Sequence, residues 1–277
     1  MKRYKNHPLS LALFLLVNLA AVITAAVVLF LIGYILWHGV PNLSLPGIFA
    51  WEYNGENQSM TPAIINTLIM TALTLFLAVP IGVFAAIYLV EYAKKGSKLV
   101  KLIRVTAETL AGIPSIVYGL FGFIVFVITL GWSYTLIAGV ITLSIMILPL
   151  IIRTTEEALM AVPDSFREGS FGLGAGKLRT VFHIVLPSAV PGIAAGIILA
   201  IGRIVGESAA LIFTSGTNPV VAKGLFTSAS TLSVHLYALL TEGLYTEQAY
   251  AVAAVLLFLV IGINALSSVA AKKLTAK

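Results

Sequence analysis

The stretch SYTLIAGVITLSIMILPLII, residues 133–152, contains twenty residues and no charged side chain. The hydrocarbon core of a bilayer is about 30 Å thick, and an α-helix rising about 1.5 Å per residue crosses it in about 20 residues. The stretch therefore predicts a membrane-spanning helix, which places the chain among the all-α integral membrane proteins.

Similar apolar runs lie on both sides of this stretch. With it they form a set of six: 9–37, 61–90, 109–130, 133–152, 188–215 and 250–271. The run 188–215 is the exception, because it carries Arg203 and Glu207. The 29 uncharged residues of the first run exceed the apolar region of a signal peptide, which has about 7 to 15 residues, so we expect an uncleaved span. The sequence thus predicts about six transmembrane helices.

The composition agrees with a membrane protein and excludes a soluble enzyme. Apolar residues make up 59% of the chain and charged residues only 10%, whereas a soluble domain is about 25% charged. The mean hydropathy of +1.03 is too high to be hidden in one core, since a domain of this size leaves roughly a quarter of its surface exposed. The chain has no cysteine, which excludes disulfides, thiolate metal sites and cysteine nucleophiles.

The positions of the positive residues predict the orientation. Fifteen of the seventeen lysines and arginines lie at the two termini and in two alternate connections: Lys2, Arg3, Lys5, Lys94, Lys95, Lys98, Lys101, Arg104, Arg153, Arg167, Lys177, Arg179, Lys272, Lys273 and Lys277. Positive residues near span ends favour the cytoplasmic side. Both termini are therefore predicted to be cytoplasmic, and the net charge of +6 reflects topology rather than nucleic-acid binding.

The predicted organisation is one membrane domain, residues 9–271, between a cytoplasmic N-terminus at 1–8 and a cytoplasmic tail at 272–277. Its outer connection 216–249 contains a moderately apolar stretch, 225–240, with serine and threonine. Those residue types occur in loops and in packed membrane helices alike. The stretch is therefore either a loop or a helix at the outer face, and a structural lid over the bundle is the simplest interpretation.

The cytoplasmic connection 153–187 carries helix signals rather than linker signals. Pro163 ends the preceding span, and Ser165 precedes Glu168 by three residues, the spacing of a capping box. A short helix is expected to begin at Ser165 and to end near Gly174, because glycine accepts the left-handed conformation that closes a helix.

A second short helix is predicted after it. Its apolar stripe consists of Leu178, Val181, Phe182 and Val185, spaced for one helix face, and Pro187 is expected to stop the helix before the fifth span. One interpretation is that these amphipathic turns rest on the membrane surface with their basic residues toward lipid headgroups.

The spacing of the same segment favours another interpretation. Glu168-Gly169-Ser170, three residues, Gly174, nine residues, then I-V-L-P at 184–187 resembles the EAA loop of ABC importer permeases, E-A-A-x3-G-x9-I-x-L-P. The resemblance implies that 168–174 is a coupling helix in a groove of a separate cytoplasmic ATPase subunit. The residues it assigns to coupling are Glu168, Gly169, Ser170, Gly174, Ile184, Leu186 and Pro187. Gly169 and Ser170 stand where the family has two alanines, which keeps small size but lowers helix propensity.

Six further motifs resemble the phosphate-specific ABC permeases, nearest the A-type subunit. They are NTL at 66–68, PIG at 80–82, AIYL at 86–89, PSIVYGL at 114–120, RTTEEA at 153–158 and GRIVGES at 202–208. The resemblance implies a type I importer (MetI-like) bundle in a bacterial or archaeal plasma membrane. It also implies three kinds of partner: a second permease chain, an ATPase dimer that binds ATP and magnesium, and an outer phosphate-binding protein. This chain itself is then a non-catalytic subunit without a cofactor.

Charged residues inside the fifth span suggest a place for the substrate. Arg203 and Glu207 are four residues apart and are expected to share a helix face. They form either a local ion pair that pins the bundle, or a site where Arg203 binds an oxyanion in passing while Glu207 holds the arginine in place. Ser208, Ser115 and Tyr118 are further candidates for the pathway, although 114–118 is as readily a packed kink.

The remaining polar residues suggest no chemistry. Glu108 is expected to pair with Arg104, and Glu156 and Glu157 are expected to be structural or to face the ATPase. The four histidines are dispersed, so we expect no metal site, and no phosphate-cradling G-x4-G-K-S/T loop occurs.

Four other functions compete with a phosphate importer. A permease for sulfate or molybdate would suit the same arginine. An ion-driven secondary transporter would need more titratable acids at membrane depth. The absence of paired acids or a Ser-His arrangement disfavours a membrane hydrolase, and the EAA-like loop disfavours a passive anion channel.

Overall fold

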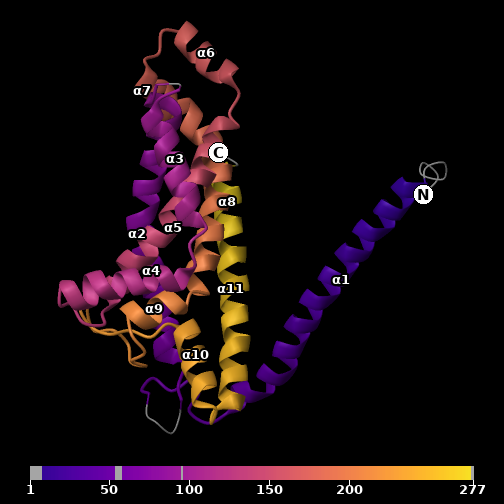
Figure 1. The fold of residues 1–277 in the computed structure, drawn as a ribbon, viewed down its shortest axis with the longest axis vertical. Helices are drawn as coiled ribbons and strands as arrows, with labels where there is room; N and C mark the ends of the chain where they lie inside the picture. The colour runs from indigo at the N-terminus through magenta and orange to yellow at the C-terminus, as the bar shows by residue number, and fades with distance from the viewer. Residues whose placement is uncertain (1–7, 54–57, 95, 276–277) are drawn as a thin grey trace.

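The fold is described from a computed structural model that covers residues 8–53, 58–94 and 96–275. All regular secondary structure within these ranges is helical (Figure 1). Five helices in them are long and apolar enough to cross a membrane, or six if one bent pair counts as a single span. The prediction of an all-α protein with about six transmembrane helices is confirmed.

The core lies where three long helices pack together. These are α2 (Thr61–Ile87), α5 (Leu136–Met160) and α8 (Leu186–Val205). The central helix is α5. In its most apolar stretch of 18 residues, 61% of the residues are buried, compared with 33% for α2 and for the span that contains α8. The side chains of Met70, Leu143, Met146, Ile147, Ile151 and Ile204 are almost completely buried there. The apolar runs predicted from the sequence therefore enclose a core as well as face lipid.

Two further long helices stand at the side of this core. α11 (Thr246–Thr275) packs along α8, whereas α1 (Pro8–Gly39) splays away from the bundle and meets α11 near only one of its ends (Figure 1). At that meeting point the Tyr34 and Tyr250 hydroxyls lie 3.2 Å apart. No residue in the most apolar 18-residue stretch of α1 is buried within the chain, as expected for a helix that contacts lipid or another membrane helix. The 3₁₀ turn η2 (Pro41–Ser44) follows it.

The predicted third span is broken. α3 (Lys98–Ala111) and α4 (Ser115–Gly122), which continues as the π-helical turn η4 (Phe123–Thr129), meet at a bend of 100°. Pro114 is the cause, because proline has no N–H to donate and it disfavours the helical conformation of the residue before it. The prediction of one continuous span over 109–130 is therefore wrong, because the helix is broken at this bend. The kink expected at 114–118 is present.

The connection between α5 and α8 lies at one end of the molecule (Figure 1). It contains α6 (Asp164–Gly172), α7 (Lys177–Thr180) and the π-helical turn η5 (Val181–Val185). The capping box is not formed, because α6 begins at Asp164 with Pro163 as its N-cap and Ser165 already lies in the first turn.

Helix structure then continues without a stop from Lys177 to Val205. The prediction that Pro187 ends a helix is therefore wrong. The π-helical turn just before it shifts the backbone hydrogen-bond register, so the proline lies near the start of α8 where it is tolerated. Of the predicted apolar stripe, Val181 and Val185 are buried, whereas 66% of Leu178 is exposed.

The opposite end of the bundle is closed by α9 (Ala209–Thr214), a non-helical stretch at 215–231 and α10 (Leu232–Glu242). The side chain of Asn66 holds the non-helical stretch, donating to the carbonyls of Val220 and Ser230 and accepting from the Ala222 amide, at 2.9–3.1 Å. The connection 216–249 is thus helical only in part, and Asn66 ties its non-helical backbone to the bundle.

Candidate functional site

The residues of the EAA-like segment divide into an exposed set and an anchoring set. Glu168 and Gly169 are exposed on α6, while Ser170 is buried and its hydroxyl lies 2.8 Å from the Thr180 hydroxyl of α7. Gly174 follows α6 with φ +79°, a left-handed conformation that favours glycine. The small residue at 170 therefore lets α6 lie on α7, and the glycine at 174 lets the chain turn between them.

The I-V-L-P end of the segment belongs to the base of α8. Ile184 and Leu186 are half-buried and Pro187 is exposed, whereas Val185, between them, is completely buried. Val185 packs in a cluster with Leu159 and Ile87, from the ends of α5 and the span that begins with α2. The segment is thereby built into the same end of the bundle as α2 and α5.

A group of exposed apolar side chains was missed by the sequence reasoning. Leu173, which joins α6 to the Gly174 turn, is 91% exposed, and other apolar side chains on this end are about half exposed or more: Phe166, Phe171 and Leu178. An apolar residue next to a glycine that ends a helix was the available signal. Exposed apolar groups outside the membrane are typical of a surface that binds another protein.

Arg167 is the second feature that was missed. Its guanidinium lies between α6 and the π-helical turn η3 (Tyr88–Tyr92) that follows α2, where Nη2 donates to Glu91 Oε1 at 2.8 Å. In the sequence Arg167 counted only as a cytoplasmic charge, because its partner is 76 residues away.

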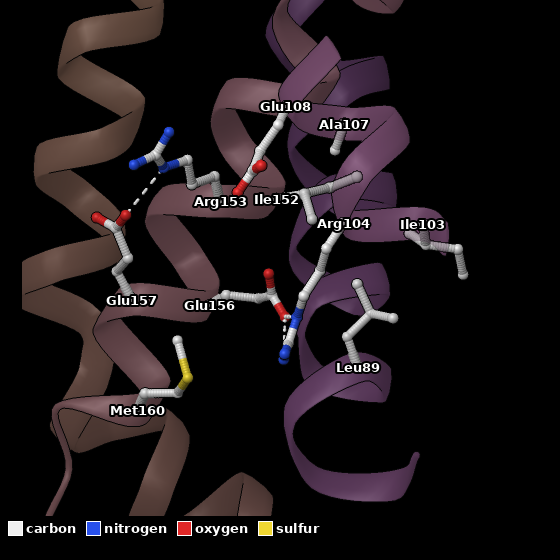
Figure 2. A pocket seen from close by; sticks show the side chains of 10 residues that line it. All are labelled: Leu89, Ile103, Arg104, Ala107, Glu108, Ile152, Arg153, Glu156, Glu157 and Met160. Atoms are coloured by element: carbon white, nitrogen blue, oxygen red, sulfur yellow. Dashed lines mark hydrogen bonds and ion pairs between the residues drawn. The ribbon is translucent and has the colours of Figure 1, made fainter. Parts of the chain in front are cut away.

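A second ion pair joins α3 to α5. Figure 2 shows Arg104 directed at Glu156, and its Nη2 and Nε donate to Glu156 Oε1 at 2.9 and 3.0 Å. The expected Arg104–Glu108 pair is therefore wrong, because the long-range partner competes successfully with the local one. Arg153 pairs with Glu157 on the exposed side of α5 at 3.0 Å. The structural role expected for Glu156 is confirmed by this contact.

Arg203 lies in the last turn of α8 beside a cavity of about 590 Å³. The cavity is lined by side chains of α5, α8 and α11: Leu150, Ala195, Ile198, Leu199, Gly202, Arg203 and Asn264. No carboxylate in the described residues forms an ion pair with Arg203. A methyl group added at Gly202 would meet no atom within 4 Å. The cavity is thus mostly apolar, with two polar side chains in its lining: the half-buried guanidinium of Arg203 and the amide of Asn264.

Glu207 does not share a helix face with Arg203, so that prediction is wrong. α8 ends at Val205, and the Glu207 carboxylate instead accepts from the Ala210 amide at 3.1 Å, at the start of α9. Ser233 of α10 donates to the Glu207 carbonyl at 2.6 Å. Ser208 is the N-cap residue of α9 and its side chain makes no capping bond. The break between the two helices is therefore held by Glu207 itself.

Tyr118 and Ser115 lie at the bend between α3 and α4. The Tyr118 hydroxyl donates to the Leu110 carbonyl at 2.8 Å and so bridges the bend, and the ring is buried. Ser115 is the first residue of α4 and is half-buried. Tyr118 packs in the same buried cluster as Ile204, the residue that follows Arg203, so these two pathway candidates lie in one region of the core.

No cluster of three or more His, Asp or Glu side chains that could hold a metal ion is found within residues 8–53, 58–94 and 96–275. The described part of the chain therefore presents a half-buried arginine beside a cavity and a group of exposed apolar side chains at one end.

A sequence profile of the family described as "binding-protein-dependent transport system inner membrane component" matches residues 78–275. The chain is 34% identical over 247 residues to a probable ABC transporter permease protein, YqgI, of Bacillus subtilis, covering 83% of each chain. It is 34% identical to the phosphate transport system permease protein PstA of Mycobacterium leprae, covering 80% of this chain and 72% of that one. It is 35% identical to PstA of Yersinia pestis, covering 79% and 77%.

Solved structures with the same fold include two transporters. The alginate ABC transporter in complex with its pentasaccharide-bound periplasmic protein superimposes with a TM-score of 0.69, at 17% identity over 99% of this chain and 97% of that one. The inward-facing MetNI methionine ABC transporter superimposes with a TM-score of 0.62, at 21% identity over 78% and 94%. At these identities the likeness concerns the fold alone.

Proposed function

Because the chain belongs to the family of binding-protein-dependent transport system inner membrane components, we propose that it is the permease subunit of an ATP-driven importer of inorganic phosphate. Its relatives in Mycobacterium leprae and Yersinia pestis are phosphate transport system permeases. In this function the chain is a multi-pass protein of a bacterial or archaeal plasma membrane and forms half of the translocation pathway.

The reason for proposing an anion as the substrate is the guanidinium of Arg203. A charge at membrane depth costs at least about 2.5 to 3.5 kcal/mol, and such groups usually face a counter-charge or a polar pathway. Arg203 has no ion-pair partner among the described residues and borders a cavity of about 590 Å³. A planar guanidinium presents parallel donors that match two oxygens of an oxyanion. A single arginine in a mostly apolar wall, with one amide from Asn264, binds phosphate weakly enough to release it.

The end of the molecule that contains α6 is proposed to bind a cytoplasmic ATPase subunit. The exposed Leu173 and its apolar neighbours supply a surface for a groove on that subunit, and Glu168 and Gly169 lie on the same exposed helix. ATP and magnesium are bound by the ATPase, so this chain carries no cofactor and no catalytic residue. Two ATPase subunits, a second homologous permease chain and an outer phosphate-binding protein complete the assembly.

The test is uptake of labelled phosphate in cells that lack their own system and express this chain with its partner subunits. We expect uptake that stops when ATP is removed and that persists with excess sulfate or molybdate. Competition by either oxyanion would assign the pathway to that oxyanion instead. Uptake that survives ATP loss but stops when the ion gradient is removed would make the chain a secondary transporter.

A further inference from the structure

The ends of three helices meet at the side chain of Arg167. An arginine has five N–H donors, and here all five are used. Nε and Nη2 donate to Glu91 Oε1 at 3.1 and 2.8 Å, and Nη1 donates to Asp164 Oδ1 at 3.2 Å. The remaining two donate to backbone carbonyls at the end of α5, those of Leu159 at 2.9 Å and Val162 at 2.8 Å.

The Arg167–Glu91 pair is largely removed from solvent. The side chains are 14% and 9% exposed, compared with 62% and 58% for the Arg153–Glu157 pair. An exposed ion pair contributes little to stability, whereas breaking a buried one is strongly destabilising because it leaves a charge without compensation. The contact between Arg167 and Glu91 is therefore stiff, in contrast to the pair on the surface of α5.

The position of Glu91 connects this contact to the membrane. Glu91 lies in η3, the π-helical turn that directly continues α2. Such turns frequently mark functional positions in helices. Arg167 thus links α6 to the end of a core span through the Glu91 carboxylate, to α5 through the Leu159 carbonyl, and to the turn after α5 through the Val162 carbonyl.

We propose that Arg167 is the positioning residue that makes α6, the η3 end of α2 and the end of α5 move as one body. A displacement of α6 by the ATPase then reaches two core spans at once, instead of being absorbed by the flexible glycines at 172, 174 and 176. This inference rests on the proposed function, since it assigns to Arg167 the transmission of ATPase movement to the pathway.

The test uses the complete complex of this chain with its partner permease, ATPase and binding protein in liposomes. Phosphate uptake and ATP hydrolysis are measured together for Arg167→Ala and for Glu91→Gln, which keeps the shape of the side chain. The matched control is Arg153→Ala, which removes the same charge from an exposed pair. Mutations that weaken coupling act by about 0.5–2 kcal/mol, so we expect phosphate moved per ATP hydrolysed to fall roughly 2- to 30-fold in the first two variants and not in the control.

A purely structural role would give a different result. The amount of assembled complex, the uptake and the hydrolysis would then fall together, with the ratio of uptake to hydrolysis unchanged, and this would overturn the proposal. Arg167→Lys retains the charge without the fork of donors, so we expect its ratio to lie between those of the wild type and Arg167→Ala.

A second readout does not depend on phosphate. The chain has no cysteine, so spin labels can be attached at Phe84→Cys on α2 and Ser165→Cys on α6, both exposed positions. In the full complex the label-to-label distance should be narrow and equal without nucleotide and with trapped ATP, and should broaden in Arg167→Ala. A wild-type distance that changes on trapping ATP would contradict the single-body proposal. If the complex moves no phosphate, the proposed function fails while this distance still tests the role of Arg167.

Discussion

Two nitrogens of the Arg167 guanidinium donate to one carboxylate oxygen of Glu91, across 76 residues of chain. This contact joins α6, which carries the exposed part of the EAA-like segment, to the continuation of a core span. It explains how a helix that is largely exposed can hold a fixed position on the bundle.

The turn at Gly174 should be sensitive to substitution by residues with a Cβ atom. An L-residue in the left-handed conformation costs about 1–2 kcal/mol, and Gly174 adopts it with φ +79°. We expect Gly174→Ala to weaken ATPase binding roughly 5- to 30-fold, measured as the affinity of the purified ATPase for this chain in nanodiscs. Gly172→Ala is the control, because Gly172 lies in α6 with space for a methyl group. Equal affinities for the two variants would contradict this role of the turn.

Leu173 should anchor the ATPase. Burying a leucine side chain contributes about 1.5–3 kcal/mol, and Leu173 is 91% exposed in the isolated chain. Leu173→Ser is expected to weaken ATPase binding roughly 10- to 100-fold in the same affinity measurement. Leu244, which is 81% exposed just after α10 at the other end of the bundle, provides the matched control. If Leu244→Ser has the larger effect, the ATPase binds elsewhere.

Asn66 should hold the outer connection in place. Its amide makes three hydrogen bonds to the backbone at 220–230, of which the one to Ser230 is buried, and a buried group left without a partner costs about 1–3 kcal/mol. We expect Asn66→Leu to raise hydrogen exchange across 216–231, with the Ala222 amide most affected. Asn18→Leu removes an amide that bonds only within α1 and should leave this exchange unchanged. Retained protection in Asn66→Leu would show that other contacts hold the connection.

The packing of α10 should weaken in acid. Burial lowers the pKa of His235 below its ordinary value, and a backbone hydrogen bond with Gln58 opposes the shift to a smaller extent. Its Nε2 is buried without a partner among the described residues. The packed His235 therefore stays neutral, whereas a His235 that is exposed when α10 opens binds a proton below about pH 6.5. The free energy that favours packed α10 over opened α10 is therefore fully present above that pH. It decreases as the pH falls below it, by at most about 1.4 kcal/mol per pH unit.

The measurement is hydrogen exchange of α10 at about pH 7.5 and about pH 5.5, corrected for the intrinsic rates. His235→Leu should abolish the dependence on pH, whereas replacement of the half-buried His38, which lies outside α10, by leucine should not. If the pH dependence persists in His235→Leu, another group is responsible for it.

Arg203 should matter for transport and not for assembly. Hydrogen bonds to a charged group contribute about 1.5–3 kcal/mol, so Arg203→Ala is expected to lower phosphate uptake roughly 10- to 100-fold at unchanged ATPase binding. Arg203→Lys should restore part of the uptake through its charge. Normal uptake by Arg203→Ala would mean that the guanidinium serves only as scaffolding.

The spans were predictable from the sequence because their signal is local. An uncharged run such as 133–152 needs no partner to be recognised, and the bend before Ser115 follows from the geometry of Pro114. The turn at Gly174 was likewise visible, since a helix commonly ends at glycine. These features depend on neighbouring residues alone.

The contacts of the charged residues were not predictable in the same way. The rule that residues four apart interact suggested Glu108 for Arg104 and Glu207 for Arg203. In the structure Arg104 pairs with Glu156, 52 residues away, and Glu207 lies beyond the end of α8. A single sequence does not indicate which distant helix ends meet, so the contacts of Arg167 could be recognised only once the bundle was assembled.

The most direct test of phosphate import is uptake by proteoliposomes that contain this chain, its partner permease and the ATPase, with the phosphate-binding protein outside and ATP inside. The proposed function predicts accumulation of labelled phosphate that requires both ATP and the binding protein and that continues when ion gradients are collapsed by ionophores. Accumulation without ATP, or its loss on collapsing the gradients, would contradict it.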